Sequence, residues 1–246
     1  MKFSIIIPVL NEARWISNTL NAVLGQSYQD FEIIVVDNAC TDNTVAIVQE
    51  FMKRDARIHL VHCPTRGLLH ARNAGLRAAQ GDIIVQLDAD NIPQPDWLFN
   101  AAKHLEDKDI VGLAGIYDYY DASAWFRYST LFVGFVMMPI GNLYVQKRKF
   151  GAFMIGGNAF IRKWVLEDMG GYDTTHTFCN EDLVTAREVA KRGQVKFCLD
   201  LTVQSSARRH KALGYFNVQS KYNIGTTALL LGRPIPRQPE EYDFPR

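Results

Sequence analysis

The sequence predicts an α/β fold built on a doubly wound, mainly parallel central sheet flanked by helices. Short, nearly continuous runs of Ile, Val and Leu recur along the chain, as in strands that are buried on both faces. Stretches with apolar residues at helical spacing separate these runs, and such alternation is typical of parallel sheets. The chain has 246 residues, a length at which α/β folds often form one domain.

The first half shows this alternation most regularly. Strands are expected at residues 4–10, 31–36, 58–62 and 83–87. The first expected helix follows Asn11, which can cap it, and the second follows Thr41 or Asp42. Their apolar faces are Ile16, Leu20, Val23 and Leu24 in the first helix, and Val45, Val48 and Met52 in the second. A third helix is expected over residues 69–79.

The second half is less regular. A helix is expected at 96–105, a strand at 110–117, a helix beginning at Glu181, a strand at 195–199 and an amphipathic stretch at 215–231. The last fourteen residues, from Arg233, hold four prolines and predict an extended tail. No internal repeat is present.

Composition and charge exclude several classes of protein. Hydrophobic residues make up 48% of the chain and charged residues 22%, which is ordinary for a globular protein, and a net charge of +1 gives no case for nucleic acid binding. The four cysteines lack a Cys-x-x-Cys pair, which favours reduced thiols in a cytosolic protein. No bilayer span is expected, because the longest apolar stretch, residues 131–140, is shorter than the roughly 18 residues of a membrane helix.

Carboxylates follow two of the predicted strands. Asp37 comes after the second strand, and Asp88 and Asp90 come after the fourth. Ligands of doubly wound sheets bind outside the carboxyl ends of the strands, so these side chains predict a site. If the chain stays extended, Asp88 and Asp90 point to one side, and paired carboxylates suit Mg²⁺ or Mn²⁺. A solvated turn is the alternative for an isolated Asp-x-Asp motif.

Two more motifs lie in the second half. Gly156-Gly157-Asn158 is a place where the backbone can approach a ligand closely. Glu181 and Asp182 fall in the first turn of an expected helix, where the helix dipole favours ionised carboxylates. The alternative for this pair is a charge-favoured helix start without chemistry.

Residues 131–149 combine an apolar stretch with a basic cluster, Lys147-Arg148-Lys149. Such a segment can rest on an anionic membrane surface as a peripheral contact. A buried helix followed by a solvated loop explains it as well. The preceding residues, 117–128, are rich in aromatic side chains, for which core packing is the commoner use and stacking on a sugar or an apolar chain the alternative.

Four blocks stand out in chain order: residues 4–12, residues 35–44, Leu87-Asp88-Ala89-Asp90 and Asn180-Glu181-Asp182. Together they resemble the motifs of the inverting family-2 glycosyltransferases with the GT-A fold, and residues 71–75 and 81–82 match as well. The resemblance covers about residues 3–200. It implies a single GT-A domain over residues 1–246, with a nucleotide-binding half at 1–95, a variable acceptor and catalytic half at 96–210, and a carboxyl-terminal helix and tail at 211–246.

The resemblance also implies which residues hold the donor and a cation. The nucleotide pocket would be lined by Pro8, Asn11, Glu12, Asp37 and Asp88, with Arg72 near the base or the diphosphate. Asp88 and Asp90 match the metal-binding Asp-x-Asp motif. His210 falls where such enzymes often place a carboxyl-terminal metal or phosphate ligand, and Arg209 is its rival for the phosphate. Asn38-Ala39-Cys40 departs from the family's usual Asp-Gly-Ser, which leaves the base open.

The catalytic residues are implied in the same way. Asp182, in a Glu-Asp motif with Glu181, matches the catalytic base. Gly156, Gly157 and Asn158 match a loop near the donor sugar and the acceptor. The motif Gln-x-x-Arg-Trp is absent, which argues against a processive, cellulose-synthase-like polymerase.

The implied function is transfer of a sugar from a nucleotide-diphosphate sugar, with a UDP-sugar favoured, to an acceptor hydroxyl with inversion and with Mn²⁺ or Mg²⁺ as cofactor. The acceptor would be a lipid-linked or cell-surface glycan precursor, and the protein would be cytoplasmic or peripheral on the inner face of the membrane. The alternatives are a nucleotidyltransferase and a nucleotide-sugar-binding protein without catalysis. Oligomeric state is left open.

Overall fold

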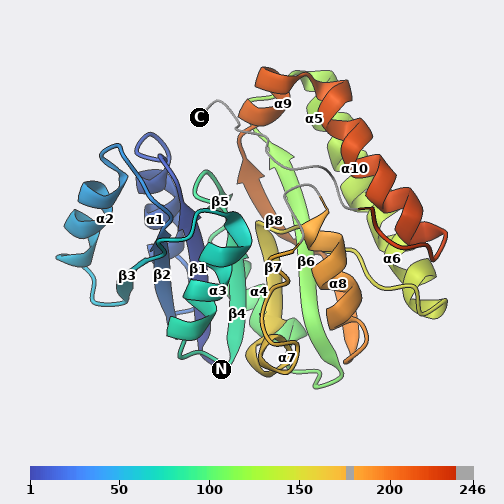
Figure 1. Cartoon of the computed structure of the whole chain (residues 1–246), viewed down its shortest axis with the longest axis horizontal. Helices are drawn as coiled ribbons and strands as arrows, with labels where there is room; N and C mark the ends of the chain where they lie inside the picture. Colours follow the sequence, from blue (N-terminus) through green and yellow to red (C-terminus); the bar gives the residue numbers. More distant parts are fainter. Residues whose placement is uncertain (176–179, 237–246) are drawn as a thin grey trace.

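The structure is a computed structural model that describes residues 1–175 and 180–236. Within these residues the chain forms one mixed α/β domain around a central eight-stranded sheet (Figure 1). The strands are β1 (Phe3–Val9), β2 (Phe31–Asp37), β3 (Ile58–His62), β4 (Ile83–Leu87), β5 (Ile92–Pro93), β6 (Ile110–Tyr119), β7 (Asn158–Arg162) and β8 (Gln194–Ser205).

The sheet is mostly parallel, as the sequence predicts. Its strand order is β3-β2-β1-β4-β7-β6-β8-β5, and β1 pairs in parallel with both β2 and β4. Strand β7 runs antiparallel to its neighbours β4 and β6. The second half of the chain therefore continues the sheet of the first half, which makes the two halves parts of one domain.

Helices cover both faces of the sheet. They are α1 (Ile16–Leu24), α2 (Thr44–Met52), α3 (Leu68–Ala78), α4 (Trp97–His104), α5 (Ala124–Phe132), α6 (Met138–Lys147), α7 (Lys163–Asp168), α8 (Glu181–Val189), α9 (Arg208–Leu213) and α10 (Tyr215–Leu230), with a π-helical segment, η1 (Val133–Met137), between α5 and α6.

Alternate residues of each central strand enter two separate cores. Ile5 and Ile7 of β1 pack with the apolar faces of α1 and α4, whereas Ile6 packs on the opposite side with α3. Residues of α7 and α8 complete the second core. Because both faces are buried, the strands need apolar residues at every position, which explains the continuous Ile and Val runs.

A third, smaller cluster joins the helices at one side of the molecule, where α6 and α10 run side by side (Figure 1). It contains Val145 of α6, Leu183 of α8 and Leu229 of α10. The elements α5, η1 and α6 form one continuous helix, Ala124–Lys147, of 24 residues. By length and composition alone this helix is long enough to cross a membrane, so the sequence-based estimate of a ten-residue apolar stretch was too short.

Candidate active site

The Asp88-Ala89-Asp90 loop directly follows β4 at the carboxyl edge of the sheet. The chain turns at Ala89 rather than staying extended as expected, and the hydroxyl of Thr19 in α1 donates to the Ala89 carbonyl at 2.7 Å. The Ala89 side chain enters the core. Burial, together with the neighbouring charges of Asp88 and Glu12, raises the pKa of Asp90 to about 6 against the opposing charge of Arg208. The carboxylates therefore lie close enough to repel one another.

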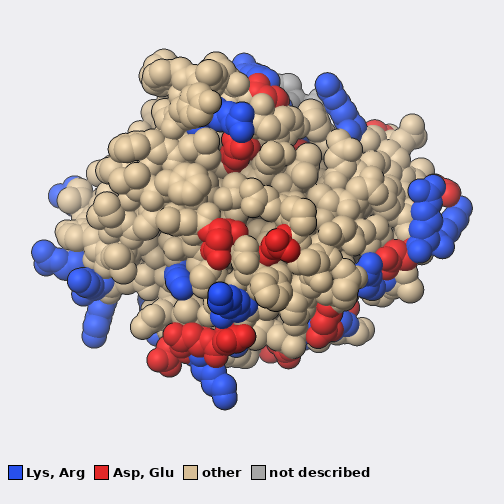
Figure 2. All heavy atoms as spheres, turned by 180° about the vertical axis from the view of Figure 1, so that it is seen from behind, with Lys and Arg blue, Asp and Glu red and all other residues tan. Residues whose placement is uncertain are grey.

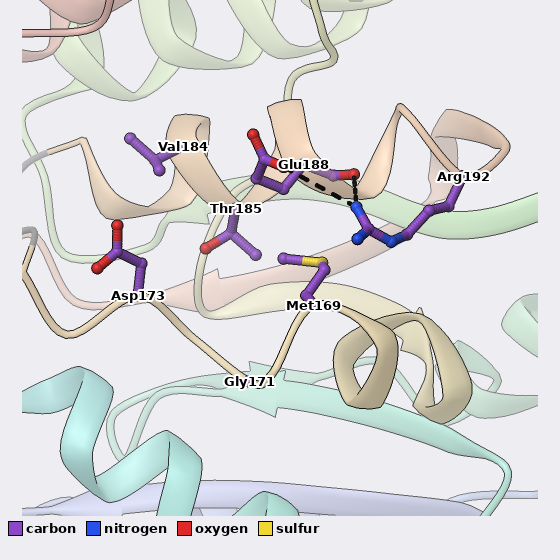
Figure 3. Close-up of a pocket in the computed structure, with 7 residues that line it drawn as sticks. All are labelled: Met169, Gly171, Asp173, Val184, Thr185, Glu188 and Arg192. Carbon is purple, nitrogen blue, oxygen red and sulfur yellow. Dashed lines mark hydrogen bonds and ion pairs between the residues drawn. The ribbon is translucent and has the colours of Figure 1, made fainter.

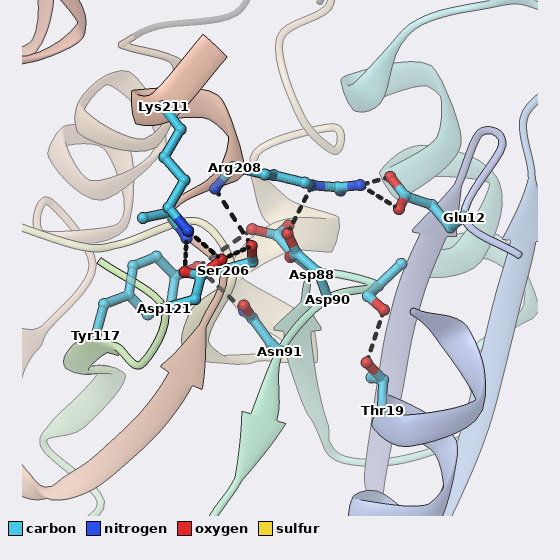
Figure 4. A network of polar contacts seen from close by, with 12 residues as sticks. Glu12, Thr19, Asp88, Asp90, Asn91, Tyr117, Asp121, Ser206, Arg208 and Lys211 are labelled. Carbon is cyan, nitrogen blue, oxygen red and sulfur yellow. Dashed lines mark hydrogen bonds and ion pairs between the residues drawn. The ribbon is translucent and has the colours of Figure 1, made fainter. Parts of the chain in front are cut away.

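Arg208 bridges two of these carboxylates (Figure 4). Its Nε lies 2.9 Å from Oδ2 of Asp90, and its Nη1 and Nη2 each donate to the Glu12 carboxylate at 2.8 Å. The arginine comes from the first turn of α9, which follows β8 at the same edge of the sheet. Arg208 thus places a positive charge of the protein itself against the acidic loop. Sequence reasoning missed it, although the run Arg208-Arg209-His210 was a signal.

His210 lies in an aromatic cluster instead. Its ring packs 4.8 Å from the Phe126 ring and 5.1 Å from the Tyr119 ring, and burial and the charge of Arg209 lower its pKa to about 4. In the part of the chain that the structure describes, His210 makes no hydrogen bond or ion pair with Asp88 or Asp90. The role of His210 as a metal or phosphate ligand therefore stays a prediction, and its buried Nδ1 has no hydrogen-bond partner among the described residues. Arg208 is the α9 side chain that reaches Asp90.

Two adjacent glycines bring the acidic motifs together. The Gly156 N–H donates to Oδ2 of Asp182 at 2.9 Å. A Cβ at Gly156 would lie 2.1 Å from Oδ1 of Asp182, and a Cβ at Gly157 would lie 2.2 Å from Oδ2 of Asp88. Any side chain at either position would displace a carboxylate. Asp182 and Asp88 therefore flank one dipeptide, although they are far apart in the sequence.

Arg72 lies beneath Asp182. It is 3% exposed, its Nη2 donates to the Gly156 carbonyl at 2.9 Å, and its Nη1 lies 3.3 Å from Oδ1 of Asp182. Burial and the charge of Glu181 raise the pKa of Asp182 towards neutrality, against the opposing charge of Arg72. The prediction placed Arg72 at the base or diphosphate. The guanidinium is buried against Asp182, and its contact with the base or the diphosphate stays a prediction.

The residues predicted to line a nucleotide pocket lie in the loops after β1 and β2. Pro8 is in β1 opposite Val36, and Asp37 ends β2. Asp37 accepts from the Cys40 N–H at 2.9 Å and lies 3.0 Å from Nδ1 of His62. These hydrogen bonds with Cys40 and His62 lower the pKa of Asp37 despite its partial burial. The Asp37 carboxylate is therefore ionised and fixed in position.

Asn11 does not cap α1 as expected. It has a φ of 59°, and its Oδ1 accepts from the Thr41 N–H at 2.7 Å. No side chain caps the amino end of α1, which follows Trp15. The amide instead joins the loop after β1 to the loop after β2, so Asn11 shapes the predicted pocket rather than the helix.

The side chain of Asn158 makes its hydrogen bonds inside the core. It is fully buried, its Oδ1 accepts from Nε1 of Trp97 at 3.0 Å, and its Nδ2 donates to the carbonyls of Leu201 and Ile116. These bonds tie β6, β7, β8 and α4 together. The Asn158 side chain therefore has a structural role, and the position of its loop near the donor sugar and the acceptor stays a prediction.

Two residues that the sequence reasoning did not single out contact this site. Tyr117 is partly buried, and its hydroxyl donates to Oδ2 of Asp88 at 3.2 Å. Asn91 is fully buried and donates to the Gly157 carbonyl at 2.8 Å. Its Oδ1 has no hydrogen-bond partner among the described residues. The continuation of the Asp-x-Asp motif into Asn91 was the signal for it.

Two other features are poor candidates for the main site. A hollow of about 100 Å³ lies between Met169, Thr185 and Arg192 (Figure 3), and it is too small for a drug-sized ligand, which needs roughly 300 Å³ or more. Elsewhere, ligand atoms of His104, Cys198 and Asp200 lie within 4.8 Å of one another. There, burial raises the pKa of Cys198 to about 12, which keeps its thiol protonated.

Comparison with known proteins identifies the family. The sequence model of Glycosyl transferase family 2 matches residues 4–170. The chain belongs to this family. Glycosyltransferase GlyG of Streptococcus pneumoniae is 27% identical over 160 residues, which cover 64% of this chain and 53% of the relative. An uncharacterized glycosyltransferase of Haemophilus influenzae is 35% identical over 119 residues, 48% of each chain. The chain spans about half the length of these curated relatives.

Solved structures agree with the family on the fold. The mannosyltransferase PcManGT of Pyrobaculum calidifontis, in complex with GDP-Man and Mn²⁺, matches with a TM-score of 0.74 and 25% identity over 93% of this chain and 64% of the neighbour. TarS 1-349 of S. aureus, in complex with UDP-GlcNAc, matches with a TM-score of 0.67 and 19% identity over 84% of this chain and 58% of the neighbour. The chain has the GT-A fold.

The Arg208 bridge yields a testable prediction. Replacing Arg208→Gln removes the counter-charge from Asp90 and Glu12, so we expect Mn²⁺ alone to bind roughly tenfold more tightly, by the Coulomb interaction of a partly buried pair. A thermal-shift titration with Mn²⁺ measures this change. Arg14→Gln is the matched control, because the guanidinium groups of Arg14 and Arg208 both stack over the Trp15 ring. Unchanged Mn²⁺ affinity in Arg208→Gln contradicts the role of the bridge.

Proposed function

We propose that this glycosyltransferase transfers a sugar from a nucleotide-diphosphate sugar to an acceptor hydroxyl with inversion and with the help of a divalent cation. The observation that carries the proposal is the Gly156-Gly157 dipeptide, which separates the Asp182 carboxylate from the Asp88 carboxylate. An inverting displacement needs a base on one side of the anomeric carbon and charge stabilisation for the leaving group on the other. Asp182 and the Asp88–Asp90 loop suit these two tasks.

The acidic loop fits a hard divalent cation. Asp88 and Asp90 would hold Mn²⁺ or Mg²⁺, since both ions take oxygen ligands. Burial, and after it the charges of Asp88 and Glu12, raises the pKa of Asp90, and a bound cation would offset both causes. The Oδ1 of Asn91, unpartnered among the described residues, adds a buried acceptor beside the loop. When bound, the cation would neutralise charge on the diphosphate as a Lewis acid. The Mn²⁺ complex of PcManGT supports this assignment.

The nucleotide would bind in the loops after β1 and β2. Pro8, Asn11, Glu12 and Asp37 remain its predicted contacts, within the predicted nucleotide-binding half, residues 1–95. The ionised Asp37 carboxylate suits the hydroxyl or N–H donors of a base or ribose. We keep a UDP-sugar as the favoured donor, with GDP-mannose as the second to test because PcManGT is in complex with it.

Asp182 is the proposed general base, with Glu181 beside it in the first turn of α8. The Asp182 side chain is 23% exposed, so an acceptor hydroxyl can reach it. In one displacement the hydroxyl oxygen bonds to the anomeric carbon, the bond to the diphosphate oxygen breaks, and the hydroxyl proton goes to Asp182. Arg72 and the Gly156 N–H orient the carboxylate for this step. A raised pKa makes it a better proton acceptor than an ordinary aspartate.

The acceptor half is proposed at residues 96–210, and the carboxyl-terminal part at 211–246, of which residues 237–246 lie outside the described residues. The acceptor is proposed to be a lipid-linked or cell-surface glycan precursor. A cytoplasmic location is also kept as a proposal. The thiols of Cys40, Cys63 and Cys198 are free in the structure, which supports a reducing compartment.

The cation site is tested by the double variant Asp88→Asn with Asp90→Asn. We expect it to lose Mn²⁺-dependent binding of UDP or GDP, because both oxygen ligands lose their charge. Isothermal calorimetry with and without Mn²⁺ measures the loss. Asp96→Asn with Asp107→Asn removes the same charge away from the site and serves as the control. Mn²⁺-dependent binding of normal strength in the first variant would rule out this cation site.

The base is tested by Asp182→Asn. We expect kcat to fall roughly 10²- to 10⁴-fold, the usual contribution of a general base, while donor affinity changes little. Product formation with the identified donor and calorimetric donor binding give the two readings. Glu188→Gln, on the same helix, should leave both unchanged. Loss of donor binding with normal turnover would overturn the assignment of Asp182.

The pH profile tests the environment of Asp182. The base works when deprotonated, so kcat at saturating Mn²⁺ and donor should fall as pH drops through the pKa of Asp182. Because that pKa is raised, the midpoint should lie above the ordinary range of an aspartate. Glu181→Gln removes a raising charge and should move the midpoint to lower pH. A midpoint near pH 4 in the unmodified protein, or one that Glu181→Gln leaves unchanged, would contradict this environment.

A further inference from the structure

The long helix Ala124–Lys147 presents apolar side chains to solvent. One stripe along it has steps of three or four residues, as one helix face requires: Trp125, Tyr128, Phe132, Val136, Ile140 and Leu143. Trp125, Tyr128, Ile140 and Leu143 are each more than 60% exposed. The stripe is roughly 27 Å long at about 1.5 Å per residue. Apolar stripes of this extent mark an interaction surface on a soluble domain.

The opposite face of the same helix is fixed to the domain. Asn142 is buried, donates to the Val195 carbonyl at 2.8 Å and accepts from the Phe153 N–H at 2.9 Å. Gln146 also donates to the Val195 carbonyl, and Phe126 is buried at the other end. Crossing a bilayer would require the helix to leave β8 and to expose these polar groups to lipid. The helix is therefore built to lie along a surface, with its stripe outward.

Helix α10 adds to this surface at one end. The Phe216 side chain is 81% exposed, and its ring lies 6.3 Å from the Trp125 ring. We call the stripe and Phe216 together the apolar face. Exposed aromatic rings at the edge of such a face are typical of groups that insert at a membrane interface.

The charge along the apolar face is mainly basic, and the two aspartates near its amino end are paired, Asp118 with Arg127 and Asp121 with Lys211. The sequence has no Asp or Glu at residues 122–166 or at residues 201–239. The exposed side chains of Lys147, Arg148 and Lys149 follow the stripe directly. In Figure 2 the side of the molecule that carries the two long helices, on the left, shows Lys and Arg at its margin and no Asp or Glu. A basic margin around an apolar stripe complements an anionic surface.

We propose that the apolar face docks on the surface of an anionic phospholipid bilayer, with the helix Ala124–Lys147 lying in the plane of the interface. The charge pattern favours this occupant over a second copy of the chain. A second copy would present another long helix without Asp or Glu, so it would offer no acidic partner on that helix to the basic side chains. The headgroups of a phosphatidylglycerol-type lipid supply the missing negative charge.

Docking would place the membrane next to the acceptor side of the site. Phe126, on the buried side of the long helix, packs 4.8 Å from His210 of α9, the helix that carries Arg208. Gly225 of α10 lies against the side chain of Asn180, two residues before Asp182. If the proposed function holds, an acceptor anchored in the bilayer would meet the catalytic base from this side. The docking itself does not depend on that function.

Vesicle flotation tests the docking with the full chain and without any donor or acceptor. We expect the protein to float with phosphatidylcholine vesicles that contain phosphatidylglycerol and to float less with phosphatidylcholine alone. Trp125→Ser with Phe132→Ser should weaken binding roughly tenfold or more, because two interfacial aromatic groups are lost. The matched control is Trp164→Ser with Phe99→Ser, which removes the same two residue types from exposed positions elsewhere.

The charged margin is tested in parallel. Lys147→Gln, Arg148→Gln and Lys149→Gln together should weaken binding to the anionic vesicles roughly tenfold and reduce its salt dependence. The control is Lys103→Gln, Arg77→Gln and Lys108→Gln, an equal loss of charge at exposed positions away from the face. Circular dichroism confirms that each variant is folded.

The outcomes separate the proposals. Absence of flotation with either vesicle, or equal loss in the control variants, overturns the docking. A dimer in size-exclusion chromatography that Trp125→Ser with Phe132→Ser converts to a monomer, without vesicle binding, assigns the face to a second copy and also overturns it. Failure of Mn²⁺-dependent nucleotide binding, with flotation intact, overturns the proposed function and leaves the docking supported.

Discussion

Mutual repulsion between carboxylates at one edge of the sheet is the constraint on which the site depends. Four acidic side chains from three separate segments meet there: Glu12, Asp88, Asp90 and Asp182. Burying such charges is costly unless they are paired. Arg208 offsets the charge at one end and Arg72 at the other. The surface-facing guanidinium can yield its place to an incoming cation, whereas the buried one is a permanent support.

The first half of the fold and the location of the site followed from local sequence patterns. Continuous apolar runs identify strands that are buried on both faces, and parallel strands end at a common edge. Asp37 and Asp88 could therefore be placed at that edge without any long-range information. The Glu-Asp motif was joined to them by family resemblance, since nothing in its local spacing specifies the distance to Asp88.

The errors arose where packing between distant segments decides the outcome. Asn11 was expected to cap α1, yet its side-chain amide accepts from the Thr41 N–H in the loop after β2. The strand β7 was missed because glycines precede it and its pairing with β4 bridges distant parts of the sequence. The long helix extends beyond the apolar stretch at residues 131–140 in both directions, so hydropathy alone did not show its length.

The reversed direction of β7 has a consequence for how insertions and deletions act. Leu87 pairs with Asn158, so the next residues outward, Asp88 and Gly157, face each other across the two strands. A slip of one residue between β4 and β7 would interchange their inward and outward sides and put the bulk of Asn158 against Asp88. The register of β4 and β7 therefore fixes which residues meet at the site. Insertions and deletions are tolerable only outside these two paired strands.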